Sequence, residues 1–247
     1  MREIFVIVVK IEYKKYNKIM RLAFTFIFIL SVFSSQCQSN SKVFILVKAM
    51  LNGQELASNV EQKINLESNT IKINELKFYL SSIQFFNNQE LVWSESNSYH
   101  LCDIFSPNSK LLEFNFQKEM NFNKIVFCLG IDSITNVSGA YGGDLDPTKG
   151  MYWTWQNGYI NLKLEGESND ELTTKNKFSY HLGGYIQPFN AIQKIELNVN
   201  NKKSFNLDFN LDKIFKSQVF YSTNKIMSPN YMAVELSKMA ASCFRIE

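Results

Sequence analysis

Few side chains of this 247-residue chain are of the kinds that bind metals or perform acid–base chemistry. Its two histidines are His100 and His181. His100 follows Tyr99 at the start of an expected strand, where a solvated or packed imidazole is the ordinary state. His181 lies among aromatic and aliphatic residues and is followed by Gly183 and Gly184, so its ring could face a site that a backbone approaches closely. Two interpretations of His181 therefore stay open, a metal ligand and a buried structural histidine.

A second candidate is the stretch 141–166, in which a glycine-rich turn leads into two tryptophans and then a strand. If the chain is extended here, Met151, Trp153 and Trp155 lie on one face, and Tyr152 lies on the other. Two indoles beside a thioether suit a packed aromatic cluster, or a site for a soft metal or redox chemistry. The pattern leaves both possibilities open.

The turn before these aromatics is expected to be shaped by its own residues. Asp146 precedes Pro147, which favours the start of a turn, and Gly150 permits a positive φ. Asp144 and Asp146 resemble part of a calcium loop, but the later glutamate of that pattern is missing. We therefore expect Asp144, Asp146 and Gly150 to shape the loop, with Asp146 capping the turn.

An enzymatic function has little support in the sequence. There is no Gly-x-Ser-x-Gly motif for a Ser-His-Asp hydrolase. Asp144, Asp146 and Glu165 could form carboxylate pairs, but nothing in the sequence fixes their separation. We therefore expect no catalytic activity. Exposed aromatic residues on a β-rich fold could instead stack on sugar rings, which leaves a carbohydrate-binding module as an alternative.

Apolar residues at alternate positions predict a mostly β-structured chain. The expected strands are 42–49, 71–86, 91–93, 99–104, 125–129, 160–165, 195–199 and 205–209. A change of parity after Leu80 predicts either a bulge or a break into two strands, and Asn52-Gly53 predicts a tight turn.

One helix is expected near the C-terminus. Ser228 and Pro229 resemble an N-cap and a first helical residue, and four apolar residues follow at helical spacing: Met232, Leu236, Met239 and Cys243. No linker interrupts the chain after Lys42. These patterns predict a single antiparallel β-sandwich with a short C-terminal helix.

The N-terminus has the features of an export signal. An apolar run, 22–33, is too short to span a bilayer and is followed by small and polar residues. We assign residues 1–37 to this signal region, with Met20 as an alternative start, and 38–247 to the mature domain. The protein is thus expected to be exported, and periplasmic or outer-membrane-associated. Membrane contact is expected only through the signal or through a lipid on Cys37, although Gln36 is a poor match to a lipidation site.

Charge and cysteine content exclude two further classes of site. Residues 1–36 hold six Lys and Arg against two Glu, so the formal charge of +3 leaves 20 basic and 21 acidic side chains in the remainder. Such a neutral domain lacks the basic clusters that nucleic-acid binding requires. Besides Cys37 the cysteines are Cys102, Cys128 and Cys243, without any Cys-x-x-Cys spacing, so a thiolate zinc or iron site has no support.

Several motifs together resemble the MbnP-like copper-binding proteins, which are exported β-rich proteins associated with bacterial copper handling. The motifs are ELKFYLSSI, LGIDSITNVSGA, GGDLDPTKGMYWTWQNGYINLKLEG and FSYHLGGY, and the resemblance runs from about Val43 to Phe209. It implies a copper site in which histidines act with a tryptophan that a diheme peroxidase-like partner oxidises to kynurenine. On this chain it implies Trp153 or Trp155 as the modified residue and His181 as the histidine of the His-Leu-Gly segment.

The chain departs from this family pattern at two places. Asn136 is followed by Val137 where copper-binding members carry Asn-His, and residues 184–186 lack the cysteine that those members place there. A copper site of soft or imidazole donors normally needs two or three of them. Met151 is a reasonable second donor, and His100 a third if the fold brings it close. The leading hypothesis is therefore an exported copper-binding protein, and the alternative is a metal-free β-sandwich module that binds carbohydrate or protein.

Overall fold

The computed structural model describes residues 16–18, 20, 21, 41–58, 60–63, 70–156, 158–169 and 177–247. The chain divides into two compact units, Met1–Ser39 and Asn40–Glu247, and the second contains both β-sheets. The apolar run 22–33 and Cys37 lie outside the described residues. No helix in the described ranges is long and apolar enough to cross a membrane.

The smaller of two sheets is built around β1 (Ser41–Leu51). Its other strands are β13 (Ser204–Asn210), β15 (Phe244–Ile246), β2 (Gln54–Glu55) and β7 (Leu111–Phe116). Every second residue of β1 from Val43 onward is buried. The β1–β2 turn contains Asn52 and Gly53 with φ values of 51° and 76°, which confirms the predicted tight turn.

The larger sheet is built around the 18-residue β4 (Thr70–Asn87). The main path runs in the order β12 (Gln193–Asn198), β8 (Lys124–Leu129), β4, β10 (Gly158–Ser168), β11 (Lys177–Gly183) and β14 (Lys225–Ile226). The strands β3 (Glu61–Lys63), β5 (Glu90–Ser94) and β6 (Tyr99–Asp103) also pair with β4, and β9 (Tyr152–Trp153) pairs with β10. Ser82 has a φ of 53° where the register between β4 and β8 shifts, which confirms the predicted bulge.

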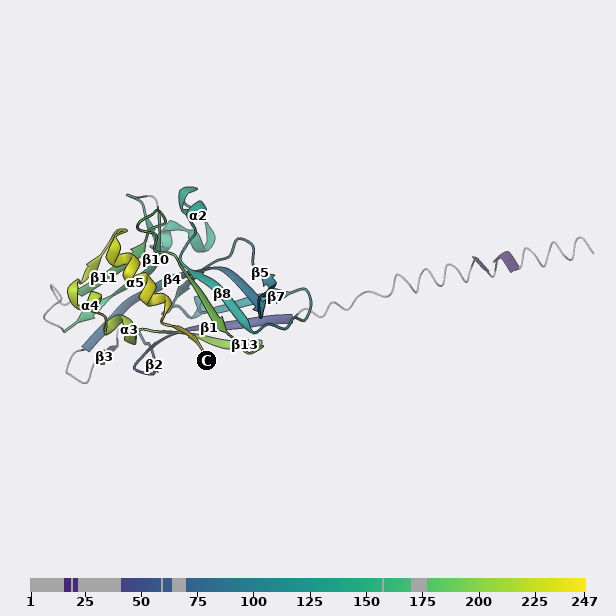
Figure 1. Ribbon diagram of the computed structural model, residues 1–247, viewed down its shortest axis with the longest axis horizontal. Helices are drawn as coiled ribbons and strands as arrows, with labels where there is room; N and C mark the ends of the chain where they lie inside the picture. Colours follow the sequence, from purple (N-terminus) through teal and green to yellow (C-terminus); the bar gives the residue numbers. More distant parts are fainter. Residues whose placement is uncertain are drawn as a thin grey trace, which may run out of the picture. The chain divides into compact units, whose positions relative to one another are not determined.

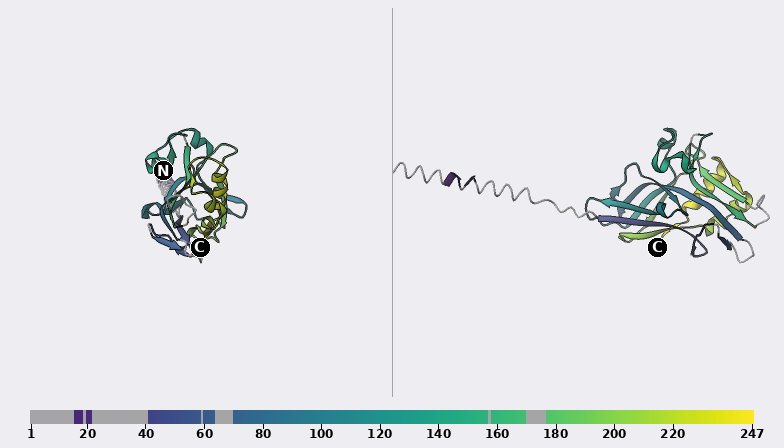
Figure 2. Two further views of the ribbon diagram at one scale, coloured as in Figure 1. Left: turned by 90° about the vertical axis from the view of Figure 1, so that its left-hand side faces the viewer. Right: turned by 180° about the vertical axis from the view of Figure 1, so that it is seen from behind.

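The main hydrophobic core lies between the two sheets, which are stacked in Figures 1 and 2. Phe78 of β4, for example, meets Phe209 of β13 with ring centroids 5.2 Å apart. The predicted β-sandwich is thereby confirmed, although its strands are not all antiparallel. The pairs β1–β13 and β11–β14 are parallel, because the chain crosses other elements before it returns beside each first strand.

The predicted C-terminal helix is present as α5 (Tyr231–Ala241), but its predicted start is wrong. The N-cap is Asn230, whose Oδ1 accepts a hydrogen bond from the backbone N–H of Ala233 at 2.9 Å. Asparagine is as good a cap as serine, so Ser228 and Pro229 lie before the helix. Other helical turns of the unit Asn40–Glu247 that lie outside the site are η1 (Pro107–Ser109), α3 (Asp212–Phe215) and α4 (Gln218–Ser222).

Residues 130–156, here called the covering segment, pack on the face of the larger sheet that points away from the main core. The segment contains α2 (Ser133–Val137), η2 (Gly143–Leu145), η3 (Pro147–Lys149) and β9. It buries a second hydrophobic cluster against β4, β6 and β10. Figure 1 shows α2 at the top of the folded unit, above β10 and β4. This arrangement brings the tryptophan stretch close to β10 and β11.

Candidate functional site

The second hydrophobic cluster forms the floor of the candidate site. Its buried members are Tyr79, Leu101, Ile131, Leu145, Met151, Trp153, Tyr159 and Ile160. Met151 is fully buried, and its carbonyl accepts a hydrogen bond from the backbone N–H of Ile160 at 2.9 Å. The start of the tryptophan stretch is therefore fixed to β10, with the Met151 thioether inside the cluster.

Trp153 is seated directly on β11 at Gly183. A Cβ atom added at Gly183 would lie 2.7 Å from Cζ3 of the Trp153 indole, so only glycine leaves room for the ring. Two residues apart on one strand, Gly183 and His181 point to the same face of the sheet. The Trp153 Nε1–H is buried and has no hydrogen-bond partner among the described residues. An orphaned buried donor is unusual and marks this position for explanation.

His181 is held by a carboxylate. Its buried imidazole contacts Glu165 on β10, with 2.5 Å between Nε2 and Oε1. Burial lowers the pKa of His181, and the hydrogen bond to Glu165 offsets this only in part, so the ring is neutral near pH 7. Because a carboxylate can only accept, Nε2 carries the proton and donates it to Glu165. The unshared electron pair of the imidazole is therefore on Nδ1.

Glu165 belongs to a row of paired charges that crosses three neighbouring strands. Lys163 lies 4.0 Å from Glu165 Oε1 and 2.7 Å from Glu75 Oε2. Lys77 then contacts Glu75 at 2.9 Å and Asp103 at 3.5 Å. Burial acts to raise the pKa of Glu75, but hydrogen bonds from both lysines outweigh it and the pKa is lowered. The two lysines thus hold Glu75 in its ionised form, and the row of charges ends at the Glu165 carboxylate that contacts His181.

Sequence reasoning missed this row of charges, although a signal was present. Lys163 and Glu165 alternate with the buried residues of β10, and Glu75 and Lys77 do the same on β4. This alternation predicts that the charged residues of each strand lie on the face away from the main core. Only the register between strands brings them together: Lys163 pairs with Lys77 on one side and with His181 on the other.

The covering segment is clamped to the sheet by polar side chains. Asn136 is buried; its Oδ1 accepts from the backbone N–H of Tyr159 at 2.8 Å, and its Nδ2 donates to the Ile131 carbonyl at 2.8 Å. Asp144 accepts from the backbone N–H of Leu101 at 3.1 Å. Each of these hydrogen bonds joins the covering segment to itself or to a strand beneath it. The bonds therefore hold the covering segment in place over the site.

The two remaining loop-shaping residues act locally. Asp146 is the N-cap of η3, and its Oδ1 accepts from the backbone N–H of Thr148 at 2.8 Å. Gly150 ends η3 with a φ of 76°. A Cβ atom added there would lie 3.9 Å from Lys163 Nζ. Residues 150–153 therefore pass over Lys163 and Gly183, and so over the part of β10 and β11 that carries His181.

Trp155 does not follow the expected alternation. The strand ends at Trp153, because the backbone N–H of Gln156 turns back to the Trp153 carbonyl. Trp155 is therefore not beside Met151 in the cluster; it is exposed, with its ring centroid 6.0 Å from that of Trp153. Tyr152 packs against Tyr159, with centroids 4.9 Å apart.

His100 is not brought to His181. His100 precedes Leu101 on β6, and Leu101 belongs to the second hydrophobic cluster. Since neighbouring residues of a strand point to opposite faces, the His100 side chain points away from that cluster. There its Nε2 lies 2.7 Å from Glu95 Oε2 and its ring meets Phe114, with centroids 5.8 Å apart. The larger sheet therefore lies between the two imidazoles.

Few side chains at this site could bind a soft metal ion. In the part of the chain that the structure describes, no group of three or more His, Cys, Asp or Glu is placed to hold a metal. Cys102, Cys128 and Cys243 are free thiols. His181 is suited to binding through Nδ1, since metal-binding histidines commonly donate their other N–H to a carboxylate. The Met151 thioether, beside Trp153 in the adjoining cluster, is a soft donor of the kind that Cu(I) prefers.

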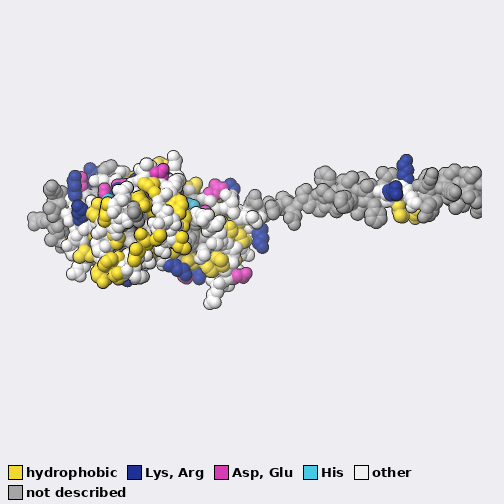
Figure 3. Space-filling view, turned by 90° about the horizontal axis from the view of Figure 1, so that it is seen from above, with side chains coloured by type: hydrophobic (Ala, Val, Ile, Leu, Met, Phe, Trp, Pro, Cys, Tyr) yellow, Lys and Arg dark blue, Asp and Glu magenta, His cyan; other side chains and the backbone are white. Residues whose placement is uncertain are grey.

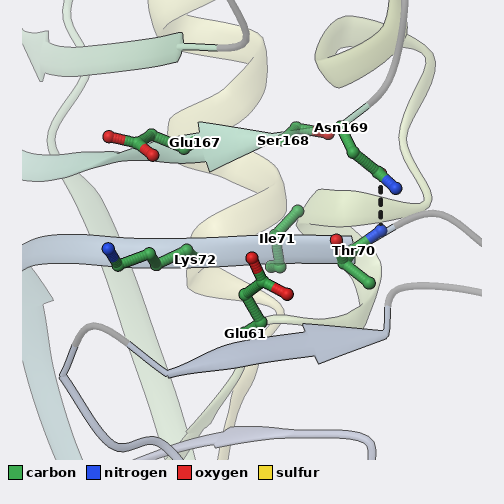
Figure 4. A pocket seen from close by; sticks show the side chains of 7 residues that line it. All are labelled: Glu61, Thr70, Ile71, Lys72, Glu167, Ser168 and Asn169. Atoms are coloured by element: carbon green, nitrogen blue, oxygen red, sulfur yellow. Dashed lines mark hydrogen bonds between the residues drawn. The ribbon is translucent and has the colours of Figure 1, made fainter.

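Hollows on the described surface lie near the row of charges, beside α2 and at one end of β4. One of about 360 Å³ adjoins the row of charges, and its lining includes Asn74, Glu75, Lys77, Asp103, Phe105, Ser106 and Glu165. Another of about 420 Å³ lies beside α2, lined by Asn97, Tyr99, Thr135, Tyr141, Gly142 and Leu145. The third, of about 130 Å³, lies at the ends of β3, β4 and β10, where the Thr70 N–H donates to Asn169 Oδ1 at 2.6 Å (Figure 4). None of the residues that the sequence singled out lines this third hollow.

Comparison with known proteins places this arrangement in a family. The family model MbnP matches residues 40–232. The chain belongs to the MbnP family. The fold is similar to the solved structure of MbnP from Methylosinus trichosporium, with a TM-score of 0.55 and 13% sequence identity over 79% of this chain and 87% of that chain. No curated protein matches the sequence. Within the MbnP-matched region lie both histidines, the tryptophan stretch and the row of charges.

Proposed function

We propose that this member of the MbnP family is an exported, non-catalytic protein that binds copper as Cu(I) on the outer face of its larger sheet. The observation that carries the proposal is the His181–Glu165 pair, with Trp153 seated two residues away on the same face. Export to the periplasm or the outer membrane is part of the proposal, because it rests on the N-terminal sequence.

The ligands that we propose are His181 Nδ1 and the Met151 thioether. Glu165 accepts the Nε2–H of the imidazole, so Nδ1 carries no proton. Nδ1 can therefore bind a metal without first losing a proton. Cu(I) is a soft ion that suits imidazole and thioether donors, and its positive charge would lie near the Glu165 carboxylate that holds His181. Met151 and Trp153 are both buried, so the thioether is shielded from water.

Trp153 is the residue that we propose for oxidation to kynurenine. Its indole Nε1–H has no lone pair to offer a metal, and it is buried without a hydrogen-bond partner in the described part of the chain. Two peroxide molecules, used by a diheme peroxidase-like partner, would each deliver one oxygen atom across the ring C2–C3 bond and leave as water. That bond breaks, and hydrolysis then releases the C2 carbon as formate. The free aromatic amine that remains can accept a metal, unlike the indole nitrogen.

The test uses the fact that the chain has only two histidines, which lie on opposite faces of one sheet. Exported protein is titrated with Cu(I) in competition with a chromophoric chelator. We expect His181→Gln to lose tight binding and the matched control His100→Gln to keep it. Met151→Leu, which preserves volume and removes the sulfur, is expected to weaken binding. Equal affinity of the His181→Gln variant and the unaltered protein would refute the proposal.

A second candidate function is a metal-free module that binds carbohydrate or protein. The exposed Trp155 favours it, because an aromatic face in solvent can stack on a sugar ring. Quenching of tryptophan fluorescence by soluble oligosaccharides, absent in Trp155→Ala, would support this candidate. Quenching that persists in that variant would exclude Trp155 as the contact.

A further inference from the structure

Four stretches of the sequence without any charged residue come together at one end of the folded unit. They are 133–143, 150–162 without the undescribed residue 157, 182–193 and 226–234, and none contains Asp, Glu, Lys, Arg or His in a chain of which 20% of residues are charged. We call the surface that they form the uncharged end. Figure 3, which views the molecule from the side of α2, shows hydrophobic side chains gathered over the middle of this face.

Contacts between the stretches show that they are neighbours. Asn136 accepts from the Tyr159 backbone, which joins the first stretch to the second. A Cβ atom at Gly158 would lie 3.3 Å from the Tyr185 ring, which joins the second to the third. The rings of Phe189 and Tyr231, with centroids 4.9 Å apart, join the third to the fourth. The uncharged end is therefore continuous from α2 to the start of α5.

Large apolar side chains of this end are turned to solvent. Their exposed fractions are 78% for Ile134, 72% for Val137, 46% for Tyr141, 66% for Trp155, 65% for Ile186, 72% for Tyr231 and 45% for Met232. If each presents on the order of 100 Å², together they approach the roughly 800 Å² that one partner contributes to a standard interface. Scattered exposed residues need no explanation, but a contiguous set of this size marks an interaction surface.

We propose that the uncharged end binds a second copy of this chain in a two-fold symmetric dimer. A two-fold axis sets the same surface against itself, so any charge on it would face a like charge nearby. The four stretches themselves avoid that repulsion, and Asp144 and Lys149, which lie between the first two stretches, pair with each other at 2.7 Å. Aromatic residues and methionine, which are frequent here, are enriched in the cores of protein interfaces, and charged residues are depleted. Surfaces that lie on lipid usually carry Lys and Arg, which this end lacks.

The dimer would cover the outer approach to the tryptophan stretch. Trp155 belongs to the uncharged end, and its ring lies 6.0 Å from that of Trp153 beneath it. The inference does not depend on copper binding, because it rests only on the exposed residues and the absence of charge.

The test is sedimentation velocity of the exported protein over a wide range of micromolar concentrations. We expect a reversible dimer that Ile134→Asp weakens about tenfold or more, because each interface then contains two unpaired carboxylates. Residue 134 is in the first turn of α2, where an acidic residue suits the helix dipole, so this variant should keep its fold. Ile186→Asp, on a different stretch, is expected to have the same effect.

Leu111→Asp is the matched control, because Leu111 is 54% exposed on β7 of the other sheet. It should leave the dimer unchanged. A monomer at every concentration would overturn the inference, as would a dimer that tolerates both Ile134→Asp and Ile186→Asp. A monomer that floats with phosphatidylcholine vesicles would overturn it in favour of a lipid partner.

Discussion

Replacing Gly183 by alanine tests how Trp153 is seated beside His181. The added methyl carbon would lie 2.7 Å from Cζ3 and 2.8 Å from Cη2 of Trp153, and 2.7 Å from the Tyr159 carbonyl oxygen. Ordinary contacts of a Cβ begin at 3.4 Å, so the overlap with the ring is about 0.7 Å. The carbonyl is part of the backbone of β10, which pairs with β11 here. Both the indole and the local pairing of β10 with β11 must therefore shift.

The expected cost follows from this overlap. Overpacking a well-filled interior destabilises by about 1–3 kcal/mol. Any Gly-to-Ala change also stabilises the folded state by about 0.4–1 kcal/mol, because it reduces the conformational entropy of the unfolded chain. Gly142→Ala has this stabilising effect without a clash and therefore serves as the control. Gly142 has an extended backbone with φ −90°, and a Cβ there would meet nothing within 4 Å. The difference between the two variants isolates the clash, and it should be about 1–3 kcal/mol.

Urea unfolding measures both free energies, and near-ultraviolet circular dichroism reports the packing of the indole. Gly183→Ala should lose part of the near-ultraviolet signal while keeping its β-sheet content, and Gly142→Ala should change neither. Equal stabilities of the two variants, with unaltered spectra, would mean that Trp153 does not rest on Gly183. The proposed site would then lose its geometric basis.

Three further outcomes are expected. Glu165→Gln should weaken Cu(I) binding by about 10–100-fold without abolishing it, since the amide still accepts from His181 but lacks the charge; unchanged affinity in the chelator competition would contradict this. Asn136→Ala should lower the free energy of unfolding by about 2–4 kcal/mol, because three backbone groups lose a hydrogen bond and two of these bonds are buried; an unchanged free energy of unfolding in urea would contradict this role of Asn136. Burial raises the pKa of the Asp208 carboxyl above its ordinary 3.8, so its ionisation in the folded state costs stability once the pH exceeds the ordinary value. Asp208→Asn should therefore gain stability relative to the unaltered protein as the pH rises from acid to neutral, and a relative loss over that range would reverse the sign.

The strands could be predicted from sequence because each buries alternate residues. The parity change on β4 even located its bulge, which Ser82 makes with a positive φ. The parallel pairing of β1 with β13 could not be predicted, since alternation gives the buried face of a strand but not its neighbour. The helix start was missed because Ser228 and Asn230 are equally good caps, and tertiary packing decides between them.

The site was only partly predictable. His181 and Trp153 were recognised from their neighbours along the chain, but the outward turn of Trp155 depends on one backbone hydrogen bond. The pairing of His181 with Glu165 depends on the register of β10 with β11, and the separation of His100 depends on the face of β6. Register and facing across a sheet are properties of the assembled fold, so no local pattern encodes them.

The central claim is that His181 presents Nδ1 to copper while Glu165 holds Nε2–H. Cu(I) is diamagnetic, so long-range proton–nitrogen NMR of the two histidine rings can follow both tautomers before and after the metal is added. The account predicts an Nε2–H tautomer for His181 at neutral pH, a shift of its Nδ1 resonance on addition of Cu(I), and an unchanged His100. A shift at His100 alone, or at neither ring, would contradict it.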